Sequence, residues 1–295
     1  MSTDQFVQYL ISGLTQGSIY ALIGLGFTII YAVTRIINFA QGEFVMLGGM
    51  LSFTLASSVG IPLIPAIILA VLIAAAVGAI MYVLAIRTAR GASVVSLIII
   101  TIGAAIFLRG VAGQIWGVNF VRPPFFSGDK SISFLGAYIH PQALWIIGTM
   151  VVVTIILHLF LSYTMVGKAL KACAINPVAS SLVGINPKTM ALIAFVLAAA
   201  VGGIGGVVMA PLIMTSYTVG VMLGLKGFVA AAIGGFKSPI AAVVGGILLG
   251  VVESLAVAAD WGPFSSAYKD AIALVVLLLI LLIRSGRLAE EEMTS

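Results

Sequence analysis

Apolar residues run along this chain in long, nearly continuous stretches instead of alternating with polar positions as they do in soluble domains. A helix needs about 20 such residues to cross the hydrocarbon layer of a membrane. We expect spans near residues 6–33, 44–60, 62–86, 93–115, 141–163, 188–212, 239–258 and 268–284. The pattern predicts an all-α polytopic membrane protein with about eight transmembrane helices, forming a single transmembrane domain over residues 1–295.

A ninth apolar segment, residues 222–236, is too short for a comfortable crossing and is bracketed by glycines. Discontinuous or re-entrant helices that line a polar pathway have this pattern. We therefore expect a half-helix here.

Glycines stand four residues apart within several apolar stretches, so both members of a pair lie on one helix face. The pairs are Gly13 and Gly17, Gly202 and Gly206, Gly220 and Gly224, and Gly246 and Gly250. Such faces let membrane helices approach closely. We expect them to pack inside the bundle, with a subunit interface as the alternative.

Composition agrees with the pattern, because 62% of the residues are hydrophobic and only 8% are charged, against roughly 25% charged residues in soluble domains. The mean hydropathy is +1.26. A net charge of +5 would suggest a nucleic-acid partner in a soluble protein. Here the basic residues lie in short loops between spans, and no nucleic-acid partner is predicted.

The basic residues also predict an orientation, because cytoplasmic loops of membrane proteins are enriched in Lys and Arg. Most of the 14 basic residues fall on one side of the predicted spans: Arg35, Arg87, Arg90, Lys168, Lys171, Lys188, Lys237, Arg284 and Arg287. This side is assigned to the cytoplasm, together with the C-terminus. No Lys or Arg precedes Arg35, so the first apolar segment is expected to be a retained span with the N-terminus outside.

The chain shows no constellation of residues typical of an enzyme. Its single cysteine, Cys173, excludes an internal disulfide, and neither His140 nor His158 neighbours a Cys or a carboxylate in sequence. The phosphate-loop pattern G-x-x-x-x-G-K-[ST] does not occur. We therefore predict no catalytic residue, no metal ligand and no cofactor on this chain, and any ATP would be handled by another protein.

Residues 164–190 form the one long polar interruption, and they contain the tripeptide Ile-Asn-Pro twice, at 175–177 and 185–187. Asn is a good N-cap and Pro is favoured at the first helical position, so each Asn-Pro predicts a helix start. The first helix is expected to run from Pro177 until Gly184, and the second is the next span.

On this short helix Val178 and Leu182 share one face, while Ser180 and Ser181 point elsewhere. The helix is expected on the cytoplasmic side, where it could insert into a partner's groove. The alternatives are a helix at the lipid headgroups or a plain connection.

A polar junction between the first two spans is the strongest candidate for a substrate pathway. Asn38, Gln41 and Glu43 lie directly before an apolar helix, and polar groups inside apolar sequence usually face a cavity or a partner. The alternative for Glu43 is to cap that helix and balance the charge of Arg35.

Further polar positions within the spans complete the candidate pathway. Gln16 and Tyr20 lie on the first span, Thr101 on the fourth and Glu253 late in the span 239–258. Glu253 and Arg109 are each expected to snorkel to the membrane surface, with a part in coupling as the alternative.

Three blocks in the same order carry a resemblance to a known family. They are GLTQGSIYALIGLGFTIIYAVTRIINFAQGEFVMLGG at 13–49, GKALKACAINPVASSLVGINPKTMALIAF at 167–195 and GLKGFVAAAIGGFKSPIAAVVGGILLGVVESLA at 224–256. The chain resembles the LivH-type permease subunit of branched-chain amino-acid ABC importers, which implies an ABC importer permease fold.

The resemblance implies a role for the polar region as well. Residues 164–188 resemble the cytoplasmic region that docks on the ATPase, with the coupling residues Lys168, Lys171, Pro177, Val178, Ser181, Leu182 and Gly184. Two positions depart from the pattern: Val178 stands where a Glu is often found, and Gln41 where the family commonly has His.

The implied partners are a second permease subunit of the LivM type, two cytoplasmic ATPases that bind ATP and Mg, a periplasmic substrate-binding protein and membrane lipid. The implied location is the bacterial inner membrane, and the implied substrate is a branched-chain or other neutral amino acid. A permease for urea or short amides, or an ATP-independent carrier or channel, remains as an alternative.

Overall fold

The computed structural model describes residues 3–89, 91–134, 136–236, 238–259, 270–276 and 278–279. Its elements are α1 (Thr3–Thr34), α2 (Gln41–Phe53), α3 (Leu63–Met81), α4 (Val94–Trp116), β1 (Ile132–Phe134), β2 (Ala137–Ile139), α5 (Pro141–Tyr163), α6 (Met165–Ile175), α7 (Pro177–Leu182), α8 (Pro187–Ile213), α9 (Val219–Ile233) and α10 (Pro239–Ala259). The predicted all-α class is confirmed, with one antiparallel hairpin, β1–β2, added in the loop before α5.

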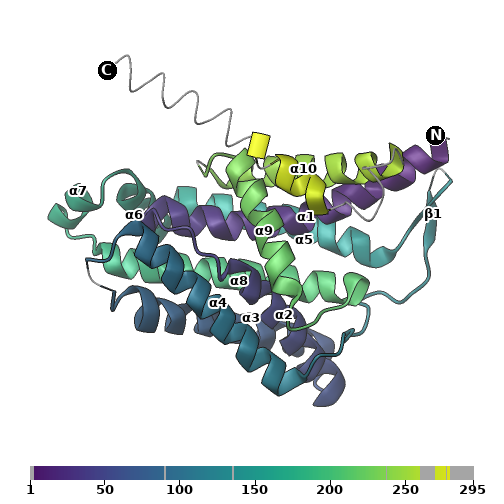
Figure 1. Cartoon of the computed structure of the whole chain (residues 1–295), viewed down its shortest axis with the longest axis horizontal. Coiled ribbons are helices and arrows are strands. Elements are labelled where there is room, and N and C mark those ends of the chain that lie inside the picture. Colours follow the sequence, from purple (N-terminus) through teal and green to yellow (C-terminus); the bar gives the residue numbers. More distant parts are fainter. Residues whose placement is uncertain are drawn as a thin grey trace.

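The long helices run roughly along the longest axis of the molecule, and the β-hairpin and the helices α6 and α7 lie at its two ends (Figure 1). The N-terminus and the hairpin are at one end, and α6 and α7 are at the other. Helices α1 and α8 are mostly buried, whereas α4 and α5 expose rows of large apolar side chains. The first pair therefore forms the core of the bundle, and the second presents a surface suited to lipid.

Among the described residues, six helices are long and apolar enough to cross a membrane. They correspond to the predicted spans that begin near residues 6, 62, 93, 141, 188 and 239. The predicted span 44–60 is instead the short helix α2, which continues in a π-helical turn over Thr54–Ser58. The predicted span 268–284 lies largely outside the described residues. Within it, residues 270–276 and 278–279 are described, and they are helical.

The paired glycines pack within the chain, as expected. A Cβ atom added at Gly13 would lie 2.9 Å from the carbonyl oxygen of Gly250, and one at Gly17 would lie 2.9 Å from that of Gly246. Helices α1 and α10 therefore touch backbone to backbone along the face that these four glycines share.

Helix α2 begins inside the bundle and not at its end. The side chain of Gln41, its first residue, donates a hydrogen bond to the carbonyl of Ala198 near the middle of α8. The preceding residues leave the end of α1 and run back into the protein to reach this point (Figure 1). The turn begins at Arg35, whose φ of 58° is the left-handed conformation that often ends a helix.

Helix α9 is the second short helix, and it confirms the expected half-helix with a start at Val219 instead of residue 222. In Figure 1 it crosses the direction of α1 steeply instead of running alongside it. The chain reaches it from the end of α8 through residues 214–218, which lie along α2: Thr215 packs beside Gly49, and Gly220 beside Gly42. Both short helices therefore begin at the same place in the bundle.

Candidate functional site

The polar junction predicted between the first two spans is fully buried. The relative exposure is 0% for Asn38, 0% for Gln41 and 1% for Glu43. Thr101 on α4 fixes the connecting chain, because its hydroxyl accepts a hydrogen bond from the backbone N–H of Phe39. The structure therefore brings all four predicted pathway residues of this region to one junction.

Several polar atoms of the junction have no hydrogen-bond partner within the described part of the chain. These are Nδ2 of Asn38, Oε1 of Gln41 and Oε2 of Glu43. Gln41 is enclosed by glycines of two core helices, since a Cβ atom at Gly26 or at Gly202 would collide with or touch its amide. Buried polar groups without partners are costly in a membrane protein and are typical of functional sites.

Glu43 pairs with Arg109 of α4, and this contact corrects two expectations. The Arg109 guanidinium donates to Oε1 of Glu43 at 2.8 Å, so Arg109 does not snorkel. Glu43 makes no capping hydrogen bond on α2 and does not pair with Arg35. Arg35 instead donates to the carbonyl of Ala174 on α6. A buried carboxylate meets a cation on the neighbouring helix because the pair costs less than either charge alone.

The start of α9 closes the junction from the other side. A Cβ atom at Gly220 would lie 2.7 Å from Oε2 of Glu43 and from the carbonyl oxygen of Gly42. The approach to this helix is polar, with Thr215 and Ser216 buried and the Ser216 hydroxyl 3.1 Å from that of Thr218. This segment was not among the predicted pathway residues, although a polar run between two apolar helices was a usable signal.

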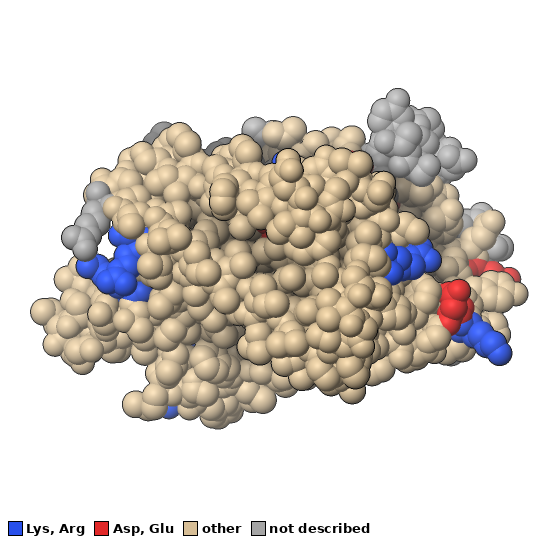
Figure 2. Space-filling model, turned by 90° about the horizontal axis from the view of Figure 1, so that it is seen from below, with Lys and Arg blue, Asp and Glu red and all other residues tan. Residues whose placement is uncertain are grey.

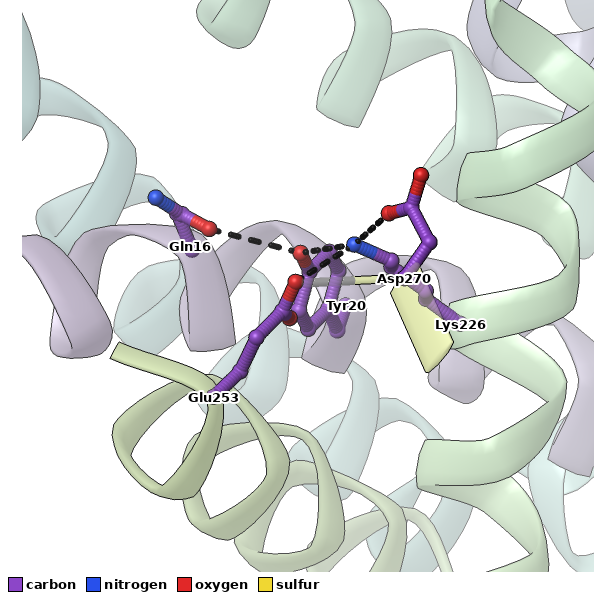
Figure 3. Close-up of polar contacts among 5 residues, drawn as sticks. All are labelled: Gln16, Tyr20, Lys226, Glu253 and Asp270. Atoms are coloured by element: carbon purple, nitrogen blue, oxygen red, sulfur yellow. Dashed lines mark hydrogen bonds and ion pairs between the residues drawn. The ribbon is translucent and has the colours of Figure 1, made fainter. Parts of the chain in front are cut away.

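A second polar cluster lies where α1, α9, α10 and the helical residues 270–276 meet (Figure 3). The Lys226 ammonium of α9 lies 2.6 Å from Oε1 of Glu253 and 2.7 Å from Oδ1 of Asp270. It also donates to the Tyr20 hydroxyl at 3.2 Å, and that hydroxyl lies 3.4 Å from Oε1 of Gln16. Three predicted pathway residues from two helices, α1 and α10, thus share one site.

The cluster also corrects the expectation for Glu253, which is 0% exposed and paired instead of snorkelling. Neither Lys226 nor Asp270 was among the predicted pathway residues. The signal for Lys226 was present, because a single cation inside the apolar stretch 222–236 must find a partner. Asp270 lacked any comparable signal, since it stands at the edge of its apolar stretch.

The predicted coupling region forms two helices, α6 and α7. Asn176 caps α7, its side-chain oxygen accepting hydrogen bonds from the N–H groups of Val178 and Ala179. The helix ends before Gly184, whose φ of 86° is left-handed. The short helix expected from Pro177 is therefore confirmed, and α6 before it was not distinguished by the sequence pattern.

The exposed face of α7 is apolar. Val178 is 70% exposed and Leu182 is 83% exposed, whereas Ser180 is buried. Ser181 is exposed on the same short helix, and Lys168 lies on α6, where Lys171 donates to the Ser162 hydroxyl. A cavity of about 400 Å³ opens beside this region, between α1, α5, α6 and the start of α10.

No group of three or more His, Cys, Asp or Glu residues within the described ranges could hold a metal ion. The chemistry available in both buried sites is hydrogen bonding and ion pairing.

Comparisons with known proteins assign the family. The family described as "Branched-chain amino acid transport system / permease component" matches residues 9–281. The permease protein LivH of a high-affinity branched-chain amino acid transport system in Salmonella typhimurium is 34% identical, covering 94% of this chain and 93% of that protein. The permease protein BraD of Pseudomonas aeruginosa is 33% identical over 97% of each chain.

A probable branched-chain amino acid transport permease protein LivH of Methanocaldococcus jannaschii is 30% identical over 90% of this chain and 87% of that protein. Among solved structures, PsaBC from Streptococcus pneumoniae in complex with Fab covers 94% of this chain and 89% of that chain, with 14% identity and a TM-score of 0.47. The family match spans nearly all of the described helices, and this multi-pass membrane protein therefore belongs to the permease components of branched-chain amino acid transport systems.

Proposed function

We propose that this chain is the membrane-spanning permease subunit of an ATP-driven importer for branched-chain or other neutral amino acids. The observation that carries the proposal is the similarity to LivH and BraD over 94% of the chain or more, because the names of those relatives state this transport. The chain itself forms part of the route through the membrane and performs no chemical reaction.

The proposed complex contains a second permease subunit of the LivM type, two cytoplasmic ATPases that bind ATP and Mg, and a periplasmic substrate-binding protein. Its location is the bacterial inner membrane, with the N-terminus outside and the C-terminus in the cytoplasm. The exposed apolar pair of α7, Val178 and Leu182, supports docking on an ATPase, since a partner that covers these side chains removes apolar area from water.

The substrate pathway is proposed to pass the two buried polar sites. One is the junction of Asn38, Gln41, Glu43 and Thr101, and the other is the cluster that includes Gln16, Tyr20 and Glu253. Their burial inside a chain with so few charges supports this assignment, because such groups are usually retained in membranes for transport.

The test is uptake of labelled leucine into cells that lack their own leucine import and express this chain with its proposed partners. Uptake is expected to require this chain, both ATPases and the binding protein, and all permease and ATPase subunits should copurify. Leucine uptake by this chain without the ATPases would instead identify a carrier or channel. Uptake of urea without uptake of leucine would identify an amide permease.

A further inference from the structure

Lys226 forms ion pairs with two carboxylates, Glu253 and Asp270, whose surroundings differ. Glu253 is completely buried, and its ion pair with Lys226 has no direct access to solvent. The Asp270 side chain is 56% exposed, although its ion pair with Lys226 is almost as short. Figure 3 shows one Asp270 oxygen facing Lys226 and the other pointing away from the cluster. Asp270 is therefore the carboxylate that another group can replace.

Asp270 is an exposed carboxylate at the edge of an apolar stretch. Leu274, one turn further along, is 40% exposed, and Val275 and Leu278 are also exposed. Lipid would suit these apolar side chains but not a carboxylate, which requires water or a polar partner. The side of the cluster that carries Asp270 is therefore the side by which a polar molecule can enter.

The charges of the cluster limit what that molecule can be. One ammonium and two ionised carboxylates leave one net negative charge. A lone carboxylate entering the cluster would add a second uncompensated negative charge, which is unfavourable in a medium of low dielectric constant. A neutral amide cannot replace either ion of the Lys226–Asp270 pair. A zwitterion adds no net charge and can pair with both ions.

Resting on the function proposed above, we propose that the Lys226–Asp270 pair recognises the α-carboxylate and α-ammonium groups of an amino-acid substrate. The substrate carboxylate takes the place of Asp270 on Lys226, and its ammonium pairs with the released Asp270 carboxylate. Glu253 remains paired with Lys226 and holds the Lys226 ammonium in position. Tyr20 supports Lys226 from α1 through its hydroxyl. The site thus selects α-amino acids over urea and short amides.

The position of Lys226 also connects this site with the junction. Lys226 lies on α9 less than two turns after Gly220, which touches Gly42 and Glu43. A substrate that opens the Lys226–Asp270 pair releases one of the contacts that hold α9. Recognition at the middle of α9 would thereby be transmitted to its first turn, where Gly220 packs against Gly42 and Glu43.

The first test measures leucine uptake by the complete importer carrying Asp270→Asn, normalised to the amount of assembled complex. The initial rate at low leucine concentration is expected to fall about tenfold or more, as for loss of a charge-assisted contact. Asp270→Glu should recover part of the rate. The matched control is Asp129→Asn, the same chemical change at an exposed residue of the outer loop, and its uptake should equal that of the unaltered protein.

The second test measures whether the substrate protects a nearby thiol from modification. A purely structural ion pair would give no such protection. Leu274→Cys on a Cys173→Ser background places a single thiol one turn from Asp270. In the reconstituted importer, with binding protein, ATP and Mg, leucine should slow modification of this thiol by a small uncharged thiol reagent that can reach it from lipid or from water. Leucinamide lacks the carboxylate and 4-methylpentanoate lacks the ammonium, so neither should protect the thiol.

The outcomes separate this site from the wider function. Normal leucine uptake by Asp270→Asn would overturn the zwitterion site and leave the amino-acid importer intact. Equal protection by leucine, leucinamide and 4-methylpentanoate, or no reaction of the Leu274→Cys thiol, would also overturn the site. Failure of the unaltered complex to import leucine would overturn the proposed function itself.

Discussion

At the scale of single residues, charges inside this membrane protein are held by opposite charges from other helices. Glu43 of α2 pairs with Arg109 of α4, and Lys226 of α9 pairs with Glu253 of α10. Removing one partner of such a pair leaves the other uncompensated, and this is usually costlier than removing both. Each pair therefore links two elements and can be tested by comparing single with double substitutions.

Glu43→Gln keeps the size of the side chain but leaves the Arg109 cation without its counter-charge. We expect the substitution to lower stability by about 1.5–3 kcal/mol, the usual size of a hydrogen bond to a charged group. Thermal unfolding of the purified subunit complex measures this loss. Leucine uptake should also fall, because Glu43 is proposed to line the pathway.

The double variant Glu43→Gln, Arg109→Met separates the two effects. It removes both charges, so it should regain part of the lost stability but not the uptake. Recovery of uptake together with stability would assign Glu43 a structural role only. Normal uptake in both Glu43→Gln and Asn38→Ala, at normal abundance, would remove the junction from the substrate route.

The sequence predicted which polar residues lie inside the protein better than it predicted their contacts. Asn38, Gln41 and Glu43 were identifiable because polar side chains interrupt apolar sequence at one place. Arg109 and Glu253 were expected to snorkel, because position along a helix indicates depth but not which helix lies beside it. Such partners depend on packing between distant segments, as with Glu253 and Lys226, and a single sequence does not record that packing.

At the scale of elements, the two short helices α2 and α9 distinguish this bundle from a set of simple crossings. The shortness of α9 was predicted from its glycine boundaries. The residues of α2 were expected to form a full span, because their apolar pattern continues through Thr54–Ser58 and gives no sign that the helix starts inside the protein. The buried start depends on contacts with α8 and α9 that are distant in sequence.

The contact between these two helix starts requires glycine at residue 42. A Cβ atom there would collide with the carbonyl oxygen of Gly220 and lie 2.9 Å from Cα of Gly224. Gly42→Ala is therefore expected to cost about 1–3 kcal/mol through overpacking and to reduce the amount of folded protein in the membrane. Fluorescence-detected size-exclusion chromatography with a thermal ramp measures both.

Gly110→Ala on α4 is the matched control for this substitution. A Cβ atom at Gly110 meets nothing within 4 Å, so this variant should be as stable as the unaltered protein or slightly more stable. If Gly42→Ala and Gly110→Ala have the same stability, α2 and α9 do not pack as described.

The apolar face of α7 leads to a prediction on coupling. The pair Val178→Asp, Leu182→Asp places two charges on this exposed face without disturbing the Asn176 cap. We expect leucine uptake to be lost while the subunit remains in the membrane, because the ATPase can no longer bury this face. Val118→Asp, Phe120→Asp, an equally exposed apolar pair in the loop after α4, is the control and should import normally. Normal uptake and ATPase copurification in the α7 variant would show that α7 is not the coupling helix.

At the scale of the whole molecule, charged side chains collect toward the two ends, as the face in Figure 2 shows, with a broad uncharged surface between them. The end that carries α6 and α7 holds Lys168, Lys171 and Lys188, and the other end holds Asp4 and Asp129 together with the basic residues Arg122 and Lys130. The hydrogen bonds between Gln8 and Tyr138 tie the start of α1 to the hairpin at this second end. Basic residues at the end with α6 and α7, opposite an end of mixed charge, agree with a protein that has α6 and α7 in the cytoplasm.

This orientation predicts opposite labelling of two engineered thiols on a Cys173→Ser background. Asp129→Cys should react with a membrane-impermeant thiol reagent added to intact cells, since Asp129 is 79% exposed at the end assigned to the outside. Lys171→Cys should react only after the membrane is permeabilised. The predicted cytoplasmic residue Arg287 lies outside the described part of the chain, and Arg287→Cys should follow Lys171→Cys if the C-terminus is inside. Labelling of Asp129→Cys only from the cytoplasmic face would show that the chain has the opposite orientation in the membrane. Helix α7 would then lie on the outer side, where no cytoplasmic ATPase could reach it.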